Sequence, residues 1–262
     1  NKIMAMLYRT SLFRRLLNRV AGKKIYEAFG GRLRFFGIGG AKLNPTVEQF
    51  LLDAKFPYAI GYGLTETSPL LAGTKVGTCR LGSTGPAMQG VTLQIHNPDP
   101  VTGEGEVWAR GINVMKGYFK EPALTAEVIT PDGWFRTGDL GVIDKDGNIY
   151  IKGRSKNMLL GPSGKNIYPE EIETLINNYR YVTEAVVISE EHKLVGLIFP
   201  DYEQLNKDGI TEETLPGALE TIRKDVNNHL PEYMAVTKFR IHPEEFAKTP
   251  KKSIKRYLYM RE

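Results

Sequence analysis

The residues best suited to chemistry stand together from Gly61 to Thr67, in the order Gly-Tyr-Gly-Leu-Thr-Glu-Thr. The two glycines permit tight turns and let a ligand approach the main chain, so we predict a loop that leaves a buried strand. The ring of Tyr62 can cover a nucleobase, the hydroxyl of Thr65 can donate to a phosphate, and the carboxylate of Glu66 can hold Mg²⁺. These are the parts of a nucleotide–metal site. A polar turn with a hydrogen-bonded glutamate is the alternative.

A second carboxylate with a defined setting is Asp139, which ends the run Thr-Gly-Asp from Thr137 to Asp139. A turn of this kind presents one carboxylate at a fixed point, where it can accept hydrogen bonds from both hydroxyls of a ribose. An ordinary Asx turn would explain an isolated Gly-Asp equally well. The pattern alone leaves both interpretations open.

The elements that precede these residues predict how the chain positions them. A strand-like run, Arg32–Ile38, leads into Gly39-Gly40-Ala41, and a helix follows with Asn44 as its cap and Pro45 at its first position. A buried strand, Phe56–Ile60, would complete a βαβ unit with parallel strands. Ligands bind at the carboxyl ends of such strands, so we expect the two glycine-containing stretches to meet there. For the glycine pair, a simple tight turn is the alternative.

The sequence pattern changes twice after this unit. From about Gly77 short strands and turns predict a small β-rich subdomain, and after Gly153 the pattern is that of a compact α+β domain. We therefore predict two domains, residues 1–153 and 154–262. The strands expected in the subdomain are Val91–Ile95, Gly105–Ala109, Val114–Tyr118, Val142–Asp144 and Asn148–Lys152. The second domain is expected to hold strands Val182–Ser189, Leu194–Phe199 and Val236–Ile241, with helices that open at Pro169 and Pro216.

Composition limits the class of protein. The 262 residues, 41% hydrophobic and 25% charged, are typical of a soluble globular protein of one large or two ordinary domains. The single cysteine, Cys79, excludes an intrachain disulfide framework, and no apolar run is long enough to span a membrane. We therefore predict a cytoplasmic protein. The net charge of +5 would permit nucleic-acid binding, but no recognition motif accompanies it, so nucleic acid is not an expected partner.

Residues 1–30 have the pattern of a basic amphipathic helix, in which apolar side chains alternate with arginine and lysine. The favoured interpretation is a surface helix whose apolar stripe lies on the core. The alternative is peripheral contact with an anionic membrane, which would make the protein membrane-associated.

Four stretches follow one another in a fixed order: Gly61–Thr67, Gly105–Tyr118, Phe135–Leu140 and Gly153–Glu173. Together they resemble the adenylate-forming superfamily of acyl-CoA synthetases, luciferases and peptide-synthetase adenylation domains. The resemblance covers nearly the whole chain. Within the superfamily, the last stretch looks most like bacterial long-chain fatty acyl-CoA ligases.

The resemblance implies a fold and a reaction. The fold would be the end of a large α/β adenylating domain, including a β-rich subdomain, followed by a small, mobile α+β domain. In the reaction, a fatty acid attacks ATP in the presence of Mg²⁺ to give acyl-AMP and pyrophosphate. The thiol of CoA then displaces AMP to give a thioester, after the small domain has rotated.

The resemblance also implies residue roles. Tyr62 would stack on adenine, Asp139 would hold the ribose hydroxyls, and Glu66 would bind Mg²⁺ and act with Thr65 in catalysis at the phosphates. Lys156 would lie at the hinge of the small domain. The set implied for nucleotide binding is Gly39, Gly40, Ala41, Tyr62, Gly63, Thr65, Asp139 and Arg154, and the set implied for CoA binding is Ser163, Gly164 and Lys165.

Two departures from the family pattern bear on activity. The family's phosphate-binding loop with its lysine is absent, so we predict a C-terminal piece of a longer ligase that is inactive in adenylation by itself. The family's C-terminal lysine bridges the α-phosphate and the carboxylate, but its position falls on Ser253, and the adjacent Lys252 is the candidate catalytic residue. The alternatives are an enzyme that loads a carrier protein and a non-catalytic nucleotide- or CoA-binding module.

Overall fold

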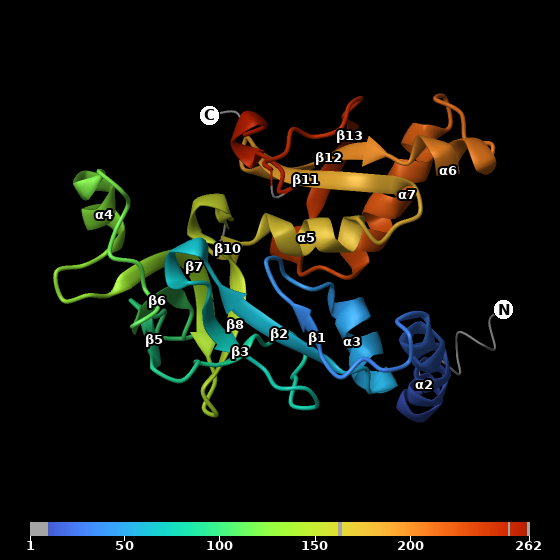
Figure 1. Ribbon diagram of the computed structural model, residues 1–262. Helices are drawn as coiled ribbons and strands as arrows, with labels where there is room; N and C mark the ends of the chain where they lie inside the picture. The colour runs from blue at the N-terminus through green and yellow to red at the C-terminus, as the bar shows by residue number, and fades with distance from the viewer. Residues whose placement is uncertain (1–9, 162–163, 251, 261–262) are drawn as a thin grey trace. The chain divides into compact units, whose positions relative to one another are not determined.

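The computed structural model describes residues 10–161, 164–250 and 252–260 (Figure 1). The chain divides into two compact units, Asn1–Lys152 and Gly153–Glu262. The first combines an α/β part with a β-rich part and the second is α+β, which confirms the predicted fold class. None of the helices in the described ranges has the length and apolar character needed to cross a membrane.

The first unit begins with the predicted βαβ arrangement. Strand β1 (Phe36–Ile38) runs parallel to β2 (Tyr58–Gly63), and helix α3 (Pro45–Ala54) connects them. Asn44 caps α3, because its side-chain oxygen accepts from the backbone N–H of Thr46 at 2.8 Å. Strand β3 (Leu70–Gly73) pairs antiparallel with β2. The buried residues of this core are Leu51, Phe56, Tyr58 and Ile60.

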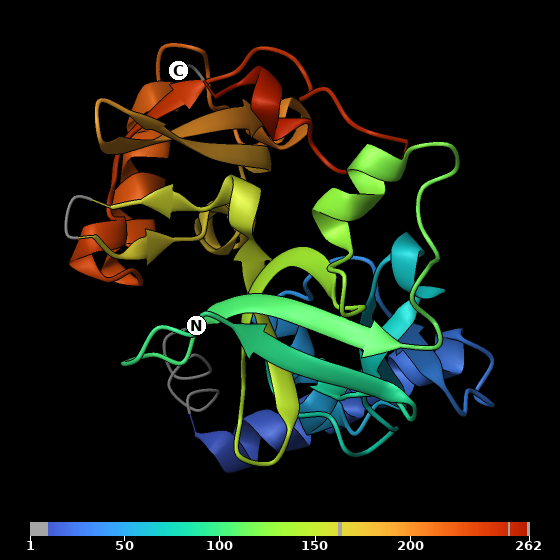
Figure 2. The same ribbon diagram turned by 90° about the vertical axis from the view of Figure 1, so that its left-hand side faces the viewer.

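A five-stranded sheet forms the β-rich part of the first unit. Its order is β4-β8-β7-β6-β5, so β5 to β8 lie side by side in the order of the chain (Figures 1 and 2). Val107 and Ile149 of this sheet are fully buried together with Ala72 of β3. The elements are β4 (Gly85–Pro86), β5 (Val91–His96), β6 (Gly105–Gly111), helix α4 (Pro122–Val128), β7 (Phe135–Ile143) and β8 (Asn148–Arg154).

The second unit is built on a three-stranded sheet with both faces covered. Successive side chains of β11 turn to opposite faces. Val187 packs in a cluster with residues of three helices, whereas Ile188 packs in a second cluster with Phe246. The strands are β11 (Val182–Glu190), β12 (Lys193–Pro200) and β13 (Val236–Ile241), and the hairpin β9 (Leu159–Leu160) and β10 (Asn166–Ile167) precedes them. The helices are α5 (Pro169–Ile176), α6 (Tyr202–Lys207) and α7 (Leu215–Asn228).

Helix α2 (Ser11–Ala28) corrects the favoured interpretation of residues 1–30, of which residues 1–9 lie outside the described ranges. Its buried residues are Asn18 and Gly22, whereas its apolar residues Leu12, Leu16 and Val20 are 82%, 60% and 58% exposed. The helix is held to α3 by polar contacts and by a close backbone approach. Its Arg14 and Asn18 both donate to Asp53, at 2.7 and 3.2 Å, and a Cβ on Gly22 would lie 2.5 Å from that of Ala54.

Three local predictions were wrong. Gly61 to Gly63 belong to strand β2 and not to a loop. Thr137 to Asp139 lie inside strand β7 and not in a free turn. Val114–Tyr118 is not a strand, because Val114 and Lys116 lie in bends and the other three residues are irregular. In the first two cases glycine was interpreted as the end of a strand, but it marks an irregularity within one.

Candidate nucleotide-binding site

The carboxyl ends of β1 and β2 lie side by side, as the βαβ pattern predicted. Ile38 pairs with Ile60, which places Gly39 next to Gly61. A Cβ on Gly39 would lie 3.2 Å from the carbonyl oxygen of Gly61, and Gly40 has a φ of +86°. Both positions therefore favour glycine, and with the exposed Ala41 they leave this edge of the sheet without large side chains.

Tyr62 and Asp139 meet although they are far apart in the sequence. The hydroxyl of Tyr62 donates to Oδ2 of Asp139 at 2.6 Å. Asp139 is only 5% exposed, and its backbone N–H donates to the hydroxyl of Thr137 at 3.1 Å, at an irregular part of the pairing between β7 and β6. A carboxylate held in this way is suited to accept hydroxyl groups of a ligand.

Gly63 and the residues after it form a tight, hydrogen-bonded corner. A Cβ on Gly63 would overlap the carbonyl oxygen of Pro69, so only glycine fits. Thr67 is fully buried, and its hydroxyl accepts from the N–H of Leu64 at 3.0 Å. Thr67 is therefore a structural residue, whereas Thr65, in the short 3-10 helix Thr65–Thr67, is exposed.

Glu66 is held by the loop that contains Met115 and Tyr118, a contact that was not predicted from the sequence. Its Oε1 accepts from the hydroxyl of Tyr118 at 3.0 Å, and its carbonyl oxygen accepts from the N–H of Met115 at 2.7 Å. Burial and the hydrogen bond to Glu66 raise the pKa of Tyr118. Asn113 in the same loop donates to the carbonyl oxygens of Thr67 and Leu70, both at 2.8 Å. No motif linked these loop residues to Glu66.

The donor set around Glu66 is compatible with Mg²⁺. No cluster of three or more histidine, cysteine, aspartate or glutamate side chains occurs within the described ranges. Mg²⁺ commonly binds through one or two carboxylates and completes its shell with water and substrate phosphates. Glu66 is half-buried, so this single carboxylate would hold the ion only together with a phosphorylated ligand.

In the second unit, the predicted residues Arg154 and Lys156 lie where β8 ends. Arg154 is the last residue of β8 and precedes a short 3-10 helix, Ser155–Asn157, that contains Lys156. Asn157 donates to Oε1 of Glu170 at 2.6 Å, which fastens this segment to α5. Both Arg154 and Lys156 are exposed.

Two of the three predicted CoA-binding residues, Gly164 and Lys165, lie in the β9–β10 hairpin. Gly164 has a φ of +73°, and the N–H of Gly161 donates to the carbonyl oxygen of Lys165 at 2.9 Å, which closes the loop. The ammonium of Lys165 lies 4.7 Å from the ring centroid of Tyr233. Ser163 lies outside the described residues.

Lys252 and Ser253 lie on an exposed turn near the C-terminus. The N–H of Lys252 donates to the carbonyl oxygen of Thr249, and the N–H of Thr249 donates to that of Ser253, both at 2.8 Å. Lys252 has a φ of +60°, an uncommon conformation for a residue with a side chain. The turn therefore presents both side chains to solvent.

Arg256 anchors this turn to the core of the second unit. It donates to Oε2 of Glu173 on α5 at 2.6 Å and to the carbonyl oxygen of Val187 on β11 at 2.9 Å. Only 11% of the Arg256 side chain and 10% of the Glu173 side chain are exposed. Burial acts to lower the pKa of Arg256, but the hydrogen bond and charge of Glu173 raise it.

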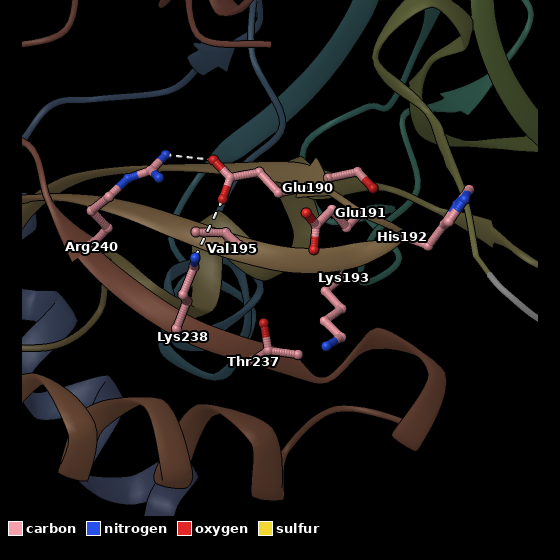
Figure 3. Close-up of a pocket in the computed structure, with 9 residues that line it drawn as sticks. Glu190, Glu191, His192, Lys193, Val195, Thr237, Lys238 and Arg240 are labelled. Carbon is pink, nitrogen blue, oxygen red and sulfur yellow. Dashed lines mark hydrogen bonds and ion pairs between the residues drawn. The ribbon is translucent and has the colours of Figure 1, made fainter. Parts of the chain in front are cut away.

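A hollow of about 770 Å³ opens beside β11, β12 and β13 of the second unit (Figure 3). Its charges are largely paired, since Glu190 lies 2.7 Å from Arg240 and 3.5 Å from Lys238. The hydrogen bond from Arg240 holds the pKa of Glu190 below its ordinary value. The hollow contains no predicted site residue; it is lined by Ser189, Glu190, Glu191, His192, Lys193, Val195, Thr237, Lys238 and Arg240.

Both units match models of AMP-binding enzymes. Residues 1–119 match the family model described as AMP-binding enzyme, and residues 157–262 match that of the AMP-binding enzyme C-terminal domain. The fold and these matches place the chain in the class of AMP-binding enzymes. Within that class the chain belongs to the adenylate-forming family, which confirms the resemblance found in the sequence.

Individual relatives include ligases with two kinds of acceptor. The chain is 30% identical to a long-chain-fatty-acid–CoA ligase of Mycobacterium bovis, over 92% of the chain and 42% of that protein. It is 31% identical to a chloroplastic long-chain-fatty-acid–[acyl-carrier-protein] ligase of Arabidopsis thaliana, over 87% of the chain and 33% of that protein. In both cases the chain spans less than half of the relative's length.

A solved structure supports the fold. The o-succinylbenzoate CoA synthetase of Bacillus subtilis, in complex with its acyl-adenylate intermediate, is similar with a TM-score of 0.73 and 24% identity. The similarity covers 87% of this chain and 46% of that protein.

Proposed function

We propose that this chain is part of a cytoplasmic long-chain fatty acid–CoA ligase that activates its substrate as acyl-AMP. The observation that carries the proposal is the contact of Tyr62 with Asp139, in the unit that also contains Glu66 and the glycine edge of β1. This arrangement supplies a ring, a buried carboxylate and a metal-competent carboxylate for one nucleotide. The name of the Mycobacterium bovis relative supports a fatty acid and CoA as the other substrates.

In the first step, the fatty acid carboxylate attacks the α-phosphorus of ATP, and the bond to the pyrophosphate oxygen breaks. Asp139 would accept the ribose hydroxyls and Tyr62 would cover the adenine, which orients the α-phosphate for attack. Mg²⁺ at Glu66 would neutralise charge on the phosphates. Thr65 would donate to a phosphate oxygen, and Gly39, Gly40, Ala41 and Gly63 would border the nucleotide.

In the second step, the CoA sulfur attacks the acyl carbon, the bond to AMP breaks, and the thiol proton is released. Ser163, Gly164 and Lys165 would contact the pantetheine chain. Lys156 would be the hinge at which the second unit turns between the two steps, and Arg154 would contact the ribose or a phosphate.

ATP–pyrophosphate exchange with a long-chain fatty acid tests the proposal. It would be measured on this chain and on a longer protein that includes the remaining length of the relatives. We expect exchange only in the longer protein, because the phosphate-binding loop of the family is not found in these 262 residues. No exchange in the longer protein, with nucleotide binding retained, would instead support a non-catalytic binding module, which Ser253 favours.

The acceptor of the acyl group needs a separate test, because the Arabidopsis thaliana relative is named for transfer to an acyl-carrier protein. We propose CoA as the acceptor. With the longer protein, a thioester should form on free CoA. A thioester formed on a carrier protein and none on CoA would favour the second acceptor.

We also propose that α2 makes peripheral contact with an anionic membrane. Its exposed residues Leu12, Leu16 and Val20 share the helix with exposed Arg15 and Arg19. The longer protein should sediment with vesicles that contain phosphatidylserine, and Leu16→Glu should abolish this. No sedimentation would indicate that the rest of the longer protein covers this face.

A further inference from the structure

Glu106 of β6 accepts hydrogen bonds from two sides: from the backbone of β7 next to Asp139, and from the side chain of Trp108 on its own strand. Its Oε1 accepts from the backbone N–H of Gly138 at 3.2 Å, and its Oε2 accepts from the indole N–H of Trp108 at 2.9 Å. Gly138 directly precedes Asp139 and has a φ of +70°. The half-buried carboxylate of Glu106 on β6 thus fixes the irregular part of β7.

The irregular part of β7 is a bulge that leaves backbone groups without regular ladder partners. Glu106 pairs with Leu140 and Trp108 pairs with Arg136. Between these two pairs β6 has one residue and β7 has three. An N–H in such a bulge needs another acceptor. Glu106 provides it for Gly138, and the hydroxyl of Thr137 accepts from the N–H of Asp139 at 3.1 Å.

The position of the Glu106 carboxylate is fixed in turn by Trp108. The Trp108 ring stacks on His96 of β5, with centroids 3.6 Å apart and planes 9° apart. The guanidinium of Arg136 on β7 lies 5.3 Å from the centroid of the same ring. Trp108 is 9% exposed, so its indole N–H needs a partner within the protein, and Glu106 is that partner.

We propose that Glu106 is the positioning residue for Asp139. Its hydrogen bond to Gly138 fixes the backbone from which the Asp139 side chain reaches Tyr62, and so it sets the recognition of ribose hydroxyls. Glu106 itself does not touch the nucleotide. The inference rests on the proposed function, because it requires a ribose bound at Asp139.

The test uses isothermal titration calorimetry on the longer protein of the exchange assay and compares ATP with 2′,3′-dideoxy-ATP, which lacks both ribose hydroxyls. The wild-type protein should bind ATP more tightly. Glu106→Ala should weaken ATP binding roughly tenfold, the size of one charge-assisted hydrogen bond, and leave dideoxy-ATP binding unchanged. Glu106→Gln should have an intermediate effect, because its single side-chain oxygen can accept from only one of the two donors.

Two further variants keep the test decisive. Trp108→Phe retains an aromatic ring for the His96 stack and removes the indole N–H, so it should reduce the preference for ATP even if Glu106→Ala fails to fold. Glu127→Ala, on the exposed face of α4, is the matched control and should change neither affinity.

The possible outcomes separate this inference from the proposed function. An equal loss of affinity for both nucleotides, or no loss for either in Glu106→Ala or Trp108→Phe, would overturn the positioning role and leave the proposed function standing. A wild-type longer protein that binds neither nucleotide would overturn the proposed function and this inference together.

Discussion

The two units hold their candidate site residues in different ways. In the first unit, Asp139 lies on paired strands, is nearly buried, and accepts from Tyr62 at 2.6 Å. In the second unit, Lys252 and Ser253 lie on an exposed turn, and the nearest buried anchor is Arg256, which pairs with Glu173. The first arrangement uses the sheet itself, whereas the second depends on the contacts of a few residues that follow the turn, among which the ion pair of Arg256 is buried.

Under the proposed function, this difference would separate recognition of the ribose from the supply of positive charge to the phosphates. A side chain that is already fixed on paired strands loses little conformational freedom when a ligand binds. An exposed lysine keeps its rotamers and must be ordered at the moment of binding, which costs about 1.5–2 kcal/mol. Under the proposed function, recognition of the ribose would therefore be built into the first unit, and the positive charge would come from a segment of the second unit that can be disturbed without disturbing recognition.

The largest expected effect is the loss of the anchor of the turn. Arg256→Ala should destabilise the second unit by about 3–5 kcal/mol, because the buried carboxylate of Glu173 loses its partner. Hydrogen exchange of the β11 and β12 amides would measure this. Arg180→Ala is the control: its pair with Asp208 is 3.0 Å long but 63% of the Arg180 side chain is exposed, so the cost should stay below about 1 kcal/mol. Equal losses of stability in Arg256→Ala and Arg180→Ala would show that the buried ion pair contributes no more than an exposed one.

The next effect decides which residue of the turn supplies charge. If Lys252 does so, Lys252→Ala in the longer protein should slow acyl-AMP formation about 100-fold or more, as loss of a charge stabiliser in an active site does. ATP affinity should change far less. The matching gain-of-charge variant is Ser253→Lys. If Ser253→Lys greatly accelerates acyl-AMP formation and Lys252→Ala does not slow it, then no residue supplies the charge in the wild type and Lys252 has no catalytic role.

A smaller effect is expected at the recognition corner. Asp139→Asn should weaken ATP binding by about 10- to 100-fold, because charge-assisted hydrogen bonds contribute about 1.5–3 kcal/mol. Tyr62→Phe keeps the ring and removes one hydroxyl, so its effect should be smaller. Titration calorimetry on the longer protein measures the ATP affinity of both variants. Hydrogen exchange in the second unit should not change in either variant, and a change there would contradict the separation of the two units' roles.

The smallest effect concerns pH, and two carboxylates on α3 should respond with opposite signs. Burial acts to raise the pKa of Asp53, but the hydrogen bond and charge of Arg14 hold it below its ordinary value of 3.8. The stability that Asp53 contributes is therefore present above that value and is lost as the pH falls through its lower, folded pKa. Asp53→Asn should flatten acid unfolding, followed by the fluorescence of Trp108 and Trp134, which both lie in the first unit.

Glu48 provides the opposite case. Burial raises its pKa above 4.5, despite the hydrogen bond from the N–H of Gly82 at 2.9 Å. Its ionisation therefore costs stability as the pH rises through the raised pKa. Glu48→Gln should be more stable than the wild type at neutral pH and lose this advantage in acid. The same sign for both variants would contradict the assigned environments.

The sequence predicted the elements whose pattern is local. The cap at Asn44, the βαβ order and strand β13 all follow from residues that are neighbours in the chain. The contact between Tyr62 and Asp139 was not predicted, because it joins residues 77 positions apart through two different sheets. Tyr118 ends one of the four stretches that carry the family resemblance, but its hydrogen bond to Glu66, 52 positions away, was not predicted.

Helix α2 shows why an amphipathic pattern alone can mislead. The pattern gives the spacing of apolar side chains but not which face has a partner. Here the partner is Asp53, a buried carboxylate that binds Arg14 and Asn18, and the close approach of α3 at Gly22 completes the contact. The face toward α3 therefore mixes these contacts with half-buried Phe13 and Leu17, and the apolar residues left exposed lie elsewhere on the helix.

The hydrogen bond between Arg256 and Glu173 spans 83 positions of the chain, and Phe246, Ile254 and Tyr259 pack against one apolar cluster of the β11–β12 hairpin. During synthesis, that hairpin leaves the ribosome well before the residues that cover it. Until the last turn emerges, Val186, Ile188, Val195 and Leu197 have no cover, and a nascent chain in this state presents an apolar sheet face to chaperones or to other chains. A ribosome stalled after β13 should therefore yield an insoluble product, whereas one stalled after the first unit should not.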